Sequence, residues 1–381
     1  MPKVQDVLAS IEEVARERIG RDSHDIDRLG QFPSRNLAAL GETGLLGLMV
    51  PEQFGGLNGG LEELARSLEV LARYCPSTAM VVLMHQCGTA VITAKGSESL
   101  KQKVLPAITR GSHLSTLAFS EAGSGGHFYI PVSQLSANHA GSHLNAFKSF
   151  VTSAGEADSY VVSTRTAKAS DPTKIDLFLV AKGSKGLAVE GSYDGLGLRG
   201  NASAPMKFDD VVVNEEIRLG AEGSGFRSML EVVLPHFQIG VAAICLGIAA
   251  SALQAATAHV SQRKYQHTGA SLSAIPRVQF LIAEMAIELN GARGYLTETI
   301  RKAVTGDQAA MLDILGVKVK ASEASVAIAS RAMTLGGGSA FAKNGDLERI
   351  FRDAQAAAVM APSSDVLKEF VGKAYLGLPL F

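Results

Sequence analysis

Leu117-Ala-Phe-Ser-Glu-Ala-Gly-Ser-Gly-Gly126 and Lys148-Ser-Phe-Val-Thr-Ser-Ala-Gly155 are the parts of the sequence that decide the fold. They lie in a stretch, 115–164, where short apolar runs alternate with small polar residues, as in strands joined by turns. The glycines lack a Cβ, so the backbone there can approach a ligand closely. Ser120 and Thr152 add hydroxyl groups that donate and accept hydrogen bonds. Two interpretations remain open: an ordinary loop between strands, or a surface for a flat, polar or phosphorylated cofactor.

Helical patterns stand on both sides of this stretch. Apolar residues recur with helical spacing before it, and alanine-rich segments long enough for a helix bundle follow it. The segments concerned are 4–19, 32–48 and 61–74, and then 228–265, 278–304 and 308–335. We therefore expect an α+β protein with an N-terminal α-helical domain (1–112), a small central β-barrel-like domain (113–215) and a C-terminal four-helix bundle (216–381).

Composition excludes several classes of protein. Of the 381 residues, 46% are hydrophobic and 19% are charged, so the chain can bury a large core. The net charge of −1 is spread without a basic block, which argues against a nucleic-acid partner. Residues 1–20 lack the apolar stretch of a signal peptide, and the three cysteines form no CxxC pair. These features predict a cytoplasmic protein with reduced thiols.

Two further segments invite an alternative interpretation. Residues 232–262 carry no Asp, Glu, Lys or Arg, but their alanine, glycine, serine and histidine content favours a buried bundle helix over a membrane span. His139 and His143 are separated by a Gly-Ser turn, so they do not form a helical metal-binding pair. We expect no membrane contact and no metal site.

Taken in order, the individual residues resemble the acyl-CoA dehydrogenase superfamily. Leu117–Gly126 resembles its first β-domain signature, and Lys148–Asp158 resembles the strand that lies against the flavin ring. Gly195–Arg199, followed by Phe208-Asp-Asp-Val-Val-Val, is similar to the next β signature. Landmarks of the bundle are matched by Arg263, Ala292-Arg293, Gly336-Gly337 and Arg349-Ile-Phe-Arg-Asp353. The likeness covers nearly the whole chain.

The resemblance implies a cofactor and its contacts. The family binds FAD in an extended form between the subunits of a tetramer. By position, Phe119, Ser120, Phe150 and Thr152 would contact the isoalloxazine and ribityl groups, beside the loop of Gly125 and Gly126. The charged fork of Arg263 would pair with the pyrophosphate of a neighbouring subunit's FAD. Gly336 and Gly337 would lie against the adenosine end, with Ser363 and Asp365 also near the cofactor.

The sequence departs from the family at the catalytic position. The family removes an α-proton from an acyl thioester with a glutamate nine residues after the arginine of its Arg-Asp pair, and here that position is Ala361, followed by Pro362. Some members carry the base on the first long bundle helix, where this chain has Phe237 with His236 beside it. The resemblance therefore implies a non-standard or relocated base, with His236 as a candidate. Other losses around the cofactor leave FMN possible.

A second branch of the superfamily offers an alternative. Flavin monooxygenases resembling dibenzothiophene monooxygenase use reduced flavin and O₂, and need no strong base at the α-carbon. His85 and Ser153 match that branch's functional histidine and serine positions, whereas a further histidine corresponds to Met360. Ser153 and His85 are therefore catalytic candidates of this reading.

Three functions remain open from the sequence. The first is a flavin-dependent oxidoreductase acting on an acyl thioester of CoA or a carrier protein. The second is a flavin monooxygenase acting on a small molecule, and the third is a non-catalytic scaffold that binds flavin or a partner. The resemblance also implies a homotetramer or homodimer, and an electron-transfer flavoprotein or a flavin reductase as redox partner.

Overall fold

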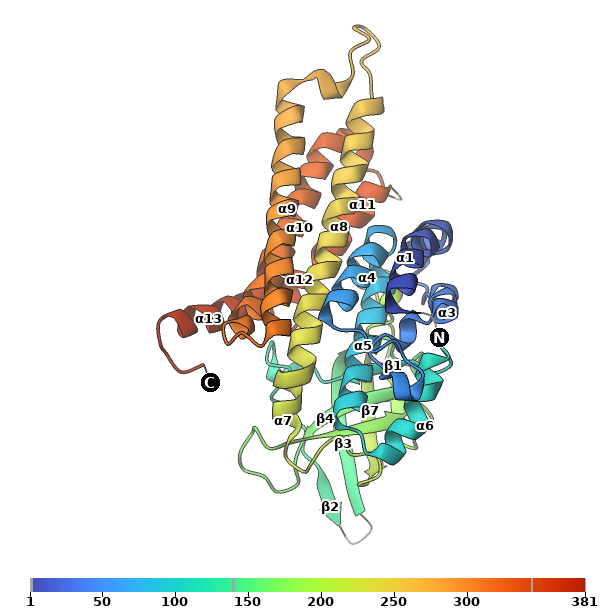
Figure 1. The fold of residues 1–381 in the computed structure, drawn as a ribbon, viewed down its shortest axis with the longest axis vertical. Helices are drawn as coiled ribbons and strands as arrows, with labels where there is room; N and C mark the ends of the chain where they lie inside the picture. The colour runs from blue at the N-terminus through green and yellow to red at the C-terminus, as the bar shows by residue number, and fades with distance from the viewer. Residues whose placement is uncertain (1–2, 139–140, 344, 381) are drawn as a thin grey trace.

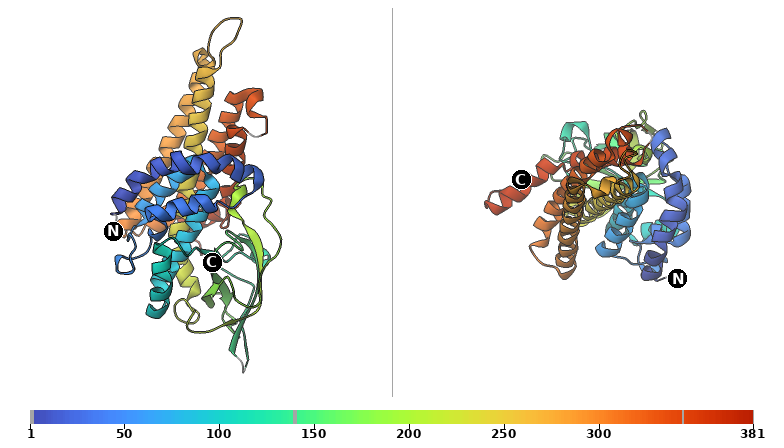
Figure 2. Two further views of the ribbon diagram at one scale, coloured as in Figure 1. Left: turned by 90° about the vertical axis from the view of Figure 1, so that its right-hand side faces the viewer. Right: turned by 90° about the horizontal axis from the view of Figure 1, so that it is seen from above.

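The computed structural model describes residues 3–138, 141–343 and 345–380. In chain order it consists of a helical N-terminal part, a β part and a long helical bundle (Figure 1). The β part lies at one end of the bundle, and the N-terminal helices pack against both (Figures 1 and 2). The α+β architecture predicted from the sequence is therefore confirmed. His139 lies outside the described residues.

The N-terminal part is arranged around one central helix. It contains α1 (Val4–Val14), α2 (Gly20–Leu29), α3 (Ser34–Thr43), α4 (Leu61–Tyr74), α5 (Pro76–Lys95) and α6 (Glu98–Thr109). α5 begins with a proline, whose missing N–H costs nothing at the first helical position, and Gly96 caps its C-terminal end. Most of its residues are buried, because α5 is apolar on all sides and contacts both β1 and α8.

Two sheets make up the β part. One has the strand order β1-β4-β5 and consists of Ser115–Ala118, Ser159–Arg165 and Ile175–Ala181. The other has the order β2-β3-β7-β6 and consists of Ser136–Asn138, Gly141–Val151, Ala204–Val213 and Leu187–Val189. β1 pairs in parallel with β4, and the other pairs are antiparallel. Leu144, Tyr160, Phe178 and Phe208 belong to the separate core of this part.

The bundle is built from three long helices, α8 (Leu234–Gln262), α9 (Pro276–Thr305) and α10 (Ala310–Ala340), and from the shorter α11 (Asp346–Ala354) and α13 (Ser364–Tyr375). α7 (Gly225–Ser228) and a π-helical turn lead into α8, and α12 (Ala356–Val359) follows α11. α10 is interrupted at Gly337, whose φ is 57° and ψ is −144°. α13 projects sideways from the bundle (Figure 1).

Two helical runs in the described residues are long and apolar enough to cross a membrane. They are 76–95 and 225–262, and 83% and 78% of their most apolar windows are buried inside the structure. Such burial is the property of core helices, because an apolar helix covered by protein has no face left for lipid. The expectation of a buried bundle helix at 232–262 is met, and the fold is consistent with a soluble protein.

The close packing of α8 against α4 depends on Gly247. A Cβ at Gly247 would collide with the carbonyl oxygen of Glu69 and lie 2.7 Å from the Cβ of Ala72. Gly247→Ala is therefore expected to destabilise the protein by about 1–3 kcal/mol, as overpacking does in cores. Gly291→Ala is the matched control, since a Cβ at this helical position of α9 meets nothing within 4 Å. Thermal denaturation of both variants measures the difference, and equal melting temperatures would contradict the prediction.

Candidate active site

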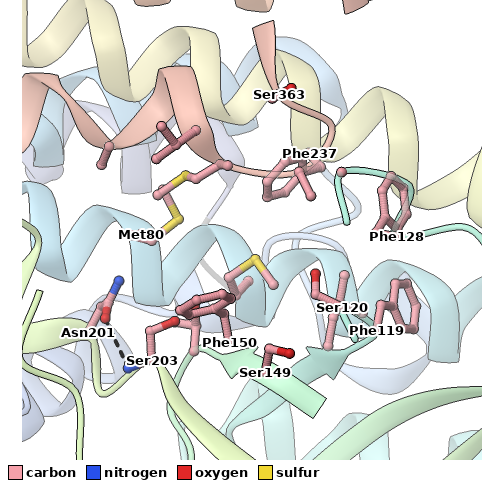
Figure 3. A pocket seen from close by; sticks show the side chains of 18 of the residues that line it. Met80, Phe119, Ser120, Phe128, Ser149, Phe150, Asn201, Ser203, Phe237 and Ser363 are labelled. Carbon is pink, nitrogen blue, oxygen red and sulfur yellow. Dashed lines mark hydrogen bonds between the residues drawn. The ribbon is translucent and has the colours of Figure 1, made fainter. Parts of the chain in front are cut away.

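A pocket of about 760 Å³ lies where the three parts of the chain meet. The β part contributes Leu117, Phe119, Ser120, Glu121, Ala122, Gly125, Gly126, Phe128, Ser149, Phe150, Thr152, Tyr193, Leu196, Gly197, Asn201 and Ser203. The helices and the segment after α12 contribute Met80, Met84, Val233, Phe237, Arg352, Gln355, Ala356, Val359, Met360, Ala361 and Ser363. Figure 3 shows Phe150, Ser120, Ser149 and Ser203 on one side of the pocket, with Phe237 and Ser363 on the other. Most of the lining is apolar.

The β wall of the pocket consists of the end of β1 and the end of β3. The Ser149 N–H donates to the Ser120 carbonyl at 2.9 Å, and the Thr116 hydroxyl donates to the Thr152 carbonyl at 2.9 Å. These bonds join β1 and the residues that follow it to the end of β3. Phe150 is 69% exposed at this wall although it is a large aromatic residue. An exposed aromatic face in a pocket favours stacking against a flat ligand.

A buried ion pair supports this wall from behind. Lys148 Nζ donates to Glu121 Oε1 at 2.7 Å and to the carbonyls of Ser163 and Phe119 at 2.6 and 3.2 Å. Glu121 also accepts hydrogen bonds from the backbone N–H groups of Val132 and Ser133. Burial alone would raise the pKa of Glu121, but Lys148 and Ser133 together hold it below its ordinary value. The pair therefore ties the glycine-rich loop to the β wall.

A charge network closes the pocket at α11. The Arg352 guanidinium, which lines the pocket, donates to both carboxylate oxygens of Asp27 and to Glu348. It also donates to the Leu196 carbonyl at 3.0 Å, while Asp353 accepts from the Leu198 N–H at 2.7 Å. Helix α2, the 193–203 loop and α11 are thereby fixed to one another. The guanidinium group of Arg352 is therefore paired with carboxylates of the protein, and it is not free to bind a ligand.

The opposite wall contains the position that the family resemblance gives to the catalytic glutamate. Ala361 and its neighbour Met360 line the pocket, and the methyl group of Ala361 can neither bind nor release a proton. Behind them, Lys318 Nζ donates to the carbonyls of Met360 and Pro362 at 3.3 and 2.9 Å. Sequence reasoning missed Lys318, although a lysine inside the apolar run 314–319 was a visible signal.

Seven of the predicted cofactor-binding residues lie around this pocket, together with Ala361, Phe237 and Met360, which occupy positions of the family's catalytic groups. The seven are Phe119, Ser120, Gly125, Gly126, Phe150, Thr152 and Ser363. Arg263, Gly336, Gly337 and Asp365 do not line it. Arg263 follows the end of α8, at the end of the bundle far from the β part (Figure 1). The contact between Arg263 and a neighbouring subunit's flavin, which the resemblance implies, stays a prediction.

The three candidate catalytic residues lie outside the pocket lining. His85 is fully buried, and it donates from Nε2 to the Leu46 carbonyl and accepts at Nδ1 from the Ser115 N–H, both at 3.0 Å. Burial lowers the pKa of His85 to about 4, so this imidazole is a neutral structural bridge between the N-terminal helices and β1. Ser153 is also buried, at a left-handed backbone position with φ of 62°. The two hydrogen bonds therefore give His85 a structural role, and Ser153 is enclosed within the fold.

His236 has one of its two nitrogens occupied. Nδ1 donates to the Val232 carbonyl at 2.7 Å, one turn earlier in the helix. Burial lowers the pKa of His236, so its neutral form prevails near neutral pH. Val233 and Phe237 on either side reach the pocket, but His236 is not among the lining residues. In the part of the chain that the structure describes, no cluster of metal-ligating side chains is found either.

Comparison with known proteins assigns this fold and site to a family. The models of the acyl-CoA dehydrogenase N-terminal, middle and C-terminal domains match residues 2–112, 116–211 and 223–376. The chain therefore belongs to the acyl-CoA dehydrogenase superfamily, a class of FAD-dependent oxidoreductases.

Individual relatives match over almost their whole length. The short-chain specific acyl-CoA dehydrogenase of Clostridium acetobutylicum is 28% identical over 95% of each chain. The cyclohex-1-ene-1-carbonyl-CoA dehydrogenase of Geobacter metallireducens is 28% identical over 97% of each chain. Among solved structures, butyryl-CoA dehydrogenase of Megasphaera elsdenii superposes with a TM-score of 0.92 at 25% identity, covering 99% of both chains.

Proposed function

We propose that this protein is an FAD-dependent oxidoreductase that oxidises an acyl thioester, carried by CoA or a carrier protein, with a non-standard base. The observation that carries the proposal is the pocket between the β wall and Ala361, which combines exposed Phe150, hydroxyl groups and a largely apolar lining. Several matched relatives are named acyl-CoA dehydrogenases, which supports a thioester substrate. We also propose domain boundaries after residues 112 and 215.

The residues of the pocket fit a flavin. Ser149 Oγ is a buried pocket-lining hydroxyl with no hydrogen-bond partner in the described residues, and a polar ring edge would satisfy it. Gly126 lies close to the start of α13, since a Cβ there would be 3.8 Å from Ser363 Oγ. A helix N-terminus beside a glycine loop suits the phosphates of FAD or FMN. Ser120, Thr152 and Phe150 would then hold the ring system.

When bound, FAD supplies an acceptor for two electrons and one hydrogen. The chain's own residues bind and orient the substrate: Met80, Met84 and Phe237 enclose an apolar acyl group and exclude water. The one carboxylate among the described lining residues, Glu121, is neutralised by Lys148 and cannot serve as a free base. We infer that the α-proton leaves to a group other than a carboxylate of this wall.

The monooxygenase alternative rests on the missing carboxylate at Ala361-Pro362 and on His85 and Ser153. Ala361 lines the pocket and fits either reaction, whereas His85 and Ser153 are buried outside the pocket lining. The relatives named above are dehydrogenases, and the scaffold reading gains nothing from them. We therefore propose neither alternative.

We propose a homotetramer or homodimer in the cytoplasm, with an electron-transfer flavoprotein or a flavin reductase as redox partner. Exposed apolar side chains on the outer helices support self-association, among them Phe280 (64%) and Ile287 (73%) of α9 and Tyr375 (81%) of α13. One matched structure, from Acidaminococcus fermentans, concerns an electron transferring flavoprotein, and it superposes with a TM-score of 0.92 at 26% identity.

Anaerobic mixing of the flavin-loaded protein with acyl-CoA thioesters tests the function. We expect the visible absorption of the oxidised flavin to bleach with at least one chain length, because oxidation of the thioester transfers two electrons to the cofactor. The bleaching should be slow, since a missing general base costs about 10²–10⁴ in rate. Chemical reduction by dithionite is the control. Bleaching by dithionite but by no thioester of any chain length would contradict the proposed function.

A further inference from the structure

Lys318 of α10 is a lysine buried without an acidic partner. Its side chain is fully buried, and no carboxylate lies within ion-pair distance among the residues that the structure describes. Its Nζ instead donates to two backbone carbonyls, those of Met360 and Pro362. A fully buried lysine is rare unless it is paired, because removing an ammonium group from water costs several kcal/mol. A residue held at such a cost is a candidate for a functional role.

The position of Lys318 relative to the pocket indicates what that role is. Met360 and Ala361 line the pocket, whereas Lys318 does not. The ammonium group therefore stands on the far side of this wall, one layer of backbone away from the pocket. The two carbonyls that it binds belong to the residues on either side of Ala361, so these hydrogen bonds hold Ala361 between two fixed points.

The surroundings leave the charge of Lys318 uncompensated. From α8, the Cys245 thiol faces it, and burial raises the pKa of that thiol to about 12, so it is neutral. The 360–362 segment presents only backbone groups. Charged residues on the other neighbouring helices form ion pairs elsewhere or are exposed: Glu284 with Arg331, Glu288 with Lys320, Asp353 with Arg349, Lys368 with Glu323, Glu369 with Lys373, and Asp365 on the surface.

We propose that Lys318 is a positioning residue of the flavin site, which holds the wall at Ala361 and directs a positive potential into the pocket. The inference rests on the proposed function. Both loss of the substrate's α-proton and transfer of two electrons to flavin build negative charge inside the pocket. In a water-poor interior a nearby positive charge stabilises that negative charge more than it would in water. The chain thereby retains electrostatic assistance at a wall that lacks a carboxylate.

The midpoint potential of the bound flavin, measured against pH, tests the proposal. Burial lowers the pKa of Lys318 to about 8, so its charge is present below pH 8 and is lost as the pH rises through that value. Lys318→Met should lower the potential below pH 8, and the difference from the wild type should vanish above it. Lys318→Arg should keep the higher potential throughout. The matched control is Lys320→Met, on the same helix but paired with Glu288 near the surface, and it should follow the wild type.

The kinetic expectation is separate from stability. Lys318→Met should slow flavin reduction by a thioester about tenfold, less than the 10²–10³ of a directly contacting donor, with little change in thioester affinity. A potential that differs from the wild type by the same amount at every pH, or not at all, would overturn the proposal. If Lys318→Met does not fold, the wild-type protein provides the test. A wild-type flavin midpoint potential that shows no inflection near pH 8 would also overturn the proposal. Failure to bind flavin would instead refute the proposed function.

Discussion

Ala361→Glu is expected to accelerate flavin reduction by an acyl-CoA substrate by about 10²–10⁴-fold, the range that a general base contributes. Ala361 lines a pocket of about 760 Å³, so the longer side chain extends into open space rather than into packed core. The described charged groups of the lining do not fill this role, because Glu121 is bound to Lys148 and Arg352 to Asp27. Anaerobic stopped-flow absorbance of the flavin band measures the rate.

Ala361→Gln is the matched control, since glutamine has nearly the same size as glutamate but cannot accept the proton. The rate of Ala361→Glu should rise with pH as the new carboxylate loses its proton, and the rate of Ala361→Gln should stay at the wild-type level. Equal rates in the two variants would show that shape, not basicity, limits the reaction. A wild-type rate that already equals that of Ala361→Glu would place an effective base elsewhere.

Lys148→Met is expected to lower the free energy of unfolding by about 3–5 kcal/mol, the typical cost of removing one partner from a buried ion pair. The side chains of Lys148 and Glu121 are 0% and 2% exposed, so the carboxylate left behind cannot be solvated. The loss should also weaken flavin binding, because Glu121 holds the loop that carries Gly125 and Gly126 through Val132 and Ser133. Urea denaturation at a fixed protein concentration and flavin titration measure the two effects.

Lys207→Met on the neighbouring strand β7 is the control for Lys148→Met. Lys207 pairs with Asp209 at 2.7 Å, but both side chains are about half exposed, so its removal should cost no more than about 1 kcal/mol. The double variant Glu121→Gln with Lys148→Met should recover part of the lost stability, because it removes the stranded charge. A Lys148→Met variant as stable as Lys207→Met would show that the buried pair does not support the loop.

The β wall of the site could be predicted because its residues are close in sequence. Phe119 and Ser120 follow β1, Phe150 lies at the end of β3 and Thr152 follows it, and both motifs are compact enough to be recognised from residue spacing. The strands and the long helices were predictable for the same reason, since periods of two and 3.6 residues are local properties. The order of helices, then strands, then helices along the chain then indicated the observed α+β fold.

The roles of the candidate catalytic residues could not be predicted from local sequence patterns. His85 and His236 were chosen for residue type and position, but a histidine's role depends on which groups its two nitrogens meet. Only the folded chain brings the Leu46 carbonyl and the Ser115 N–H to opposite sides of the His85 ring. Lys318 was overlooked because its acceptors at 360 and 362 lie more than 40 residues away.

The sequence by itself determined the succession of helical, β and helical parts, the family resemblance, the two motifs that form the β wall and the alanine at position 361. Tertiary structure alone decided which polar groups are free to react. Arg352 and Asp27 are 325 residues apart and neutralise each other, and Glu121 is neutralised by Lys148. The physical reason is that hydrogen bonding and charge pairing depend on distances in space, whereas residue patterns record only local conformation and burial.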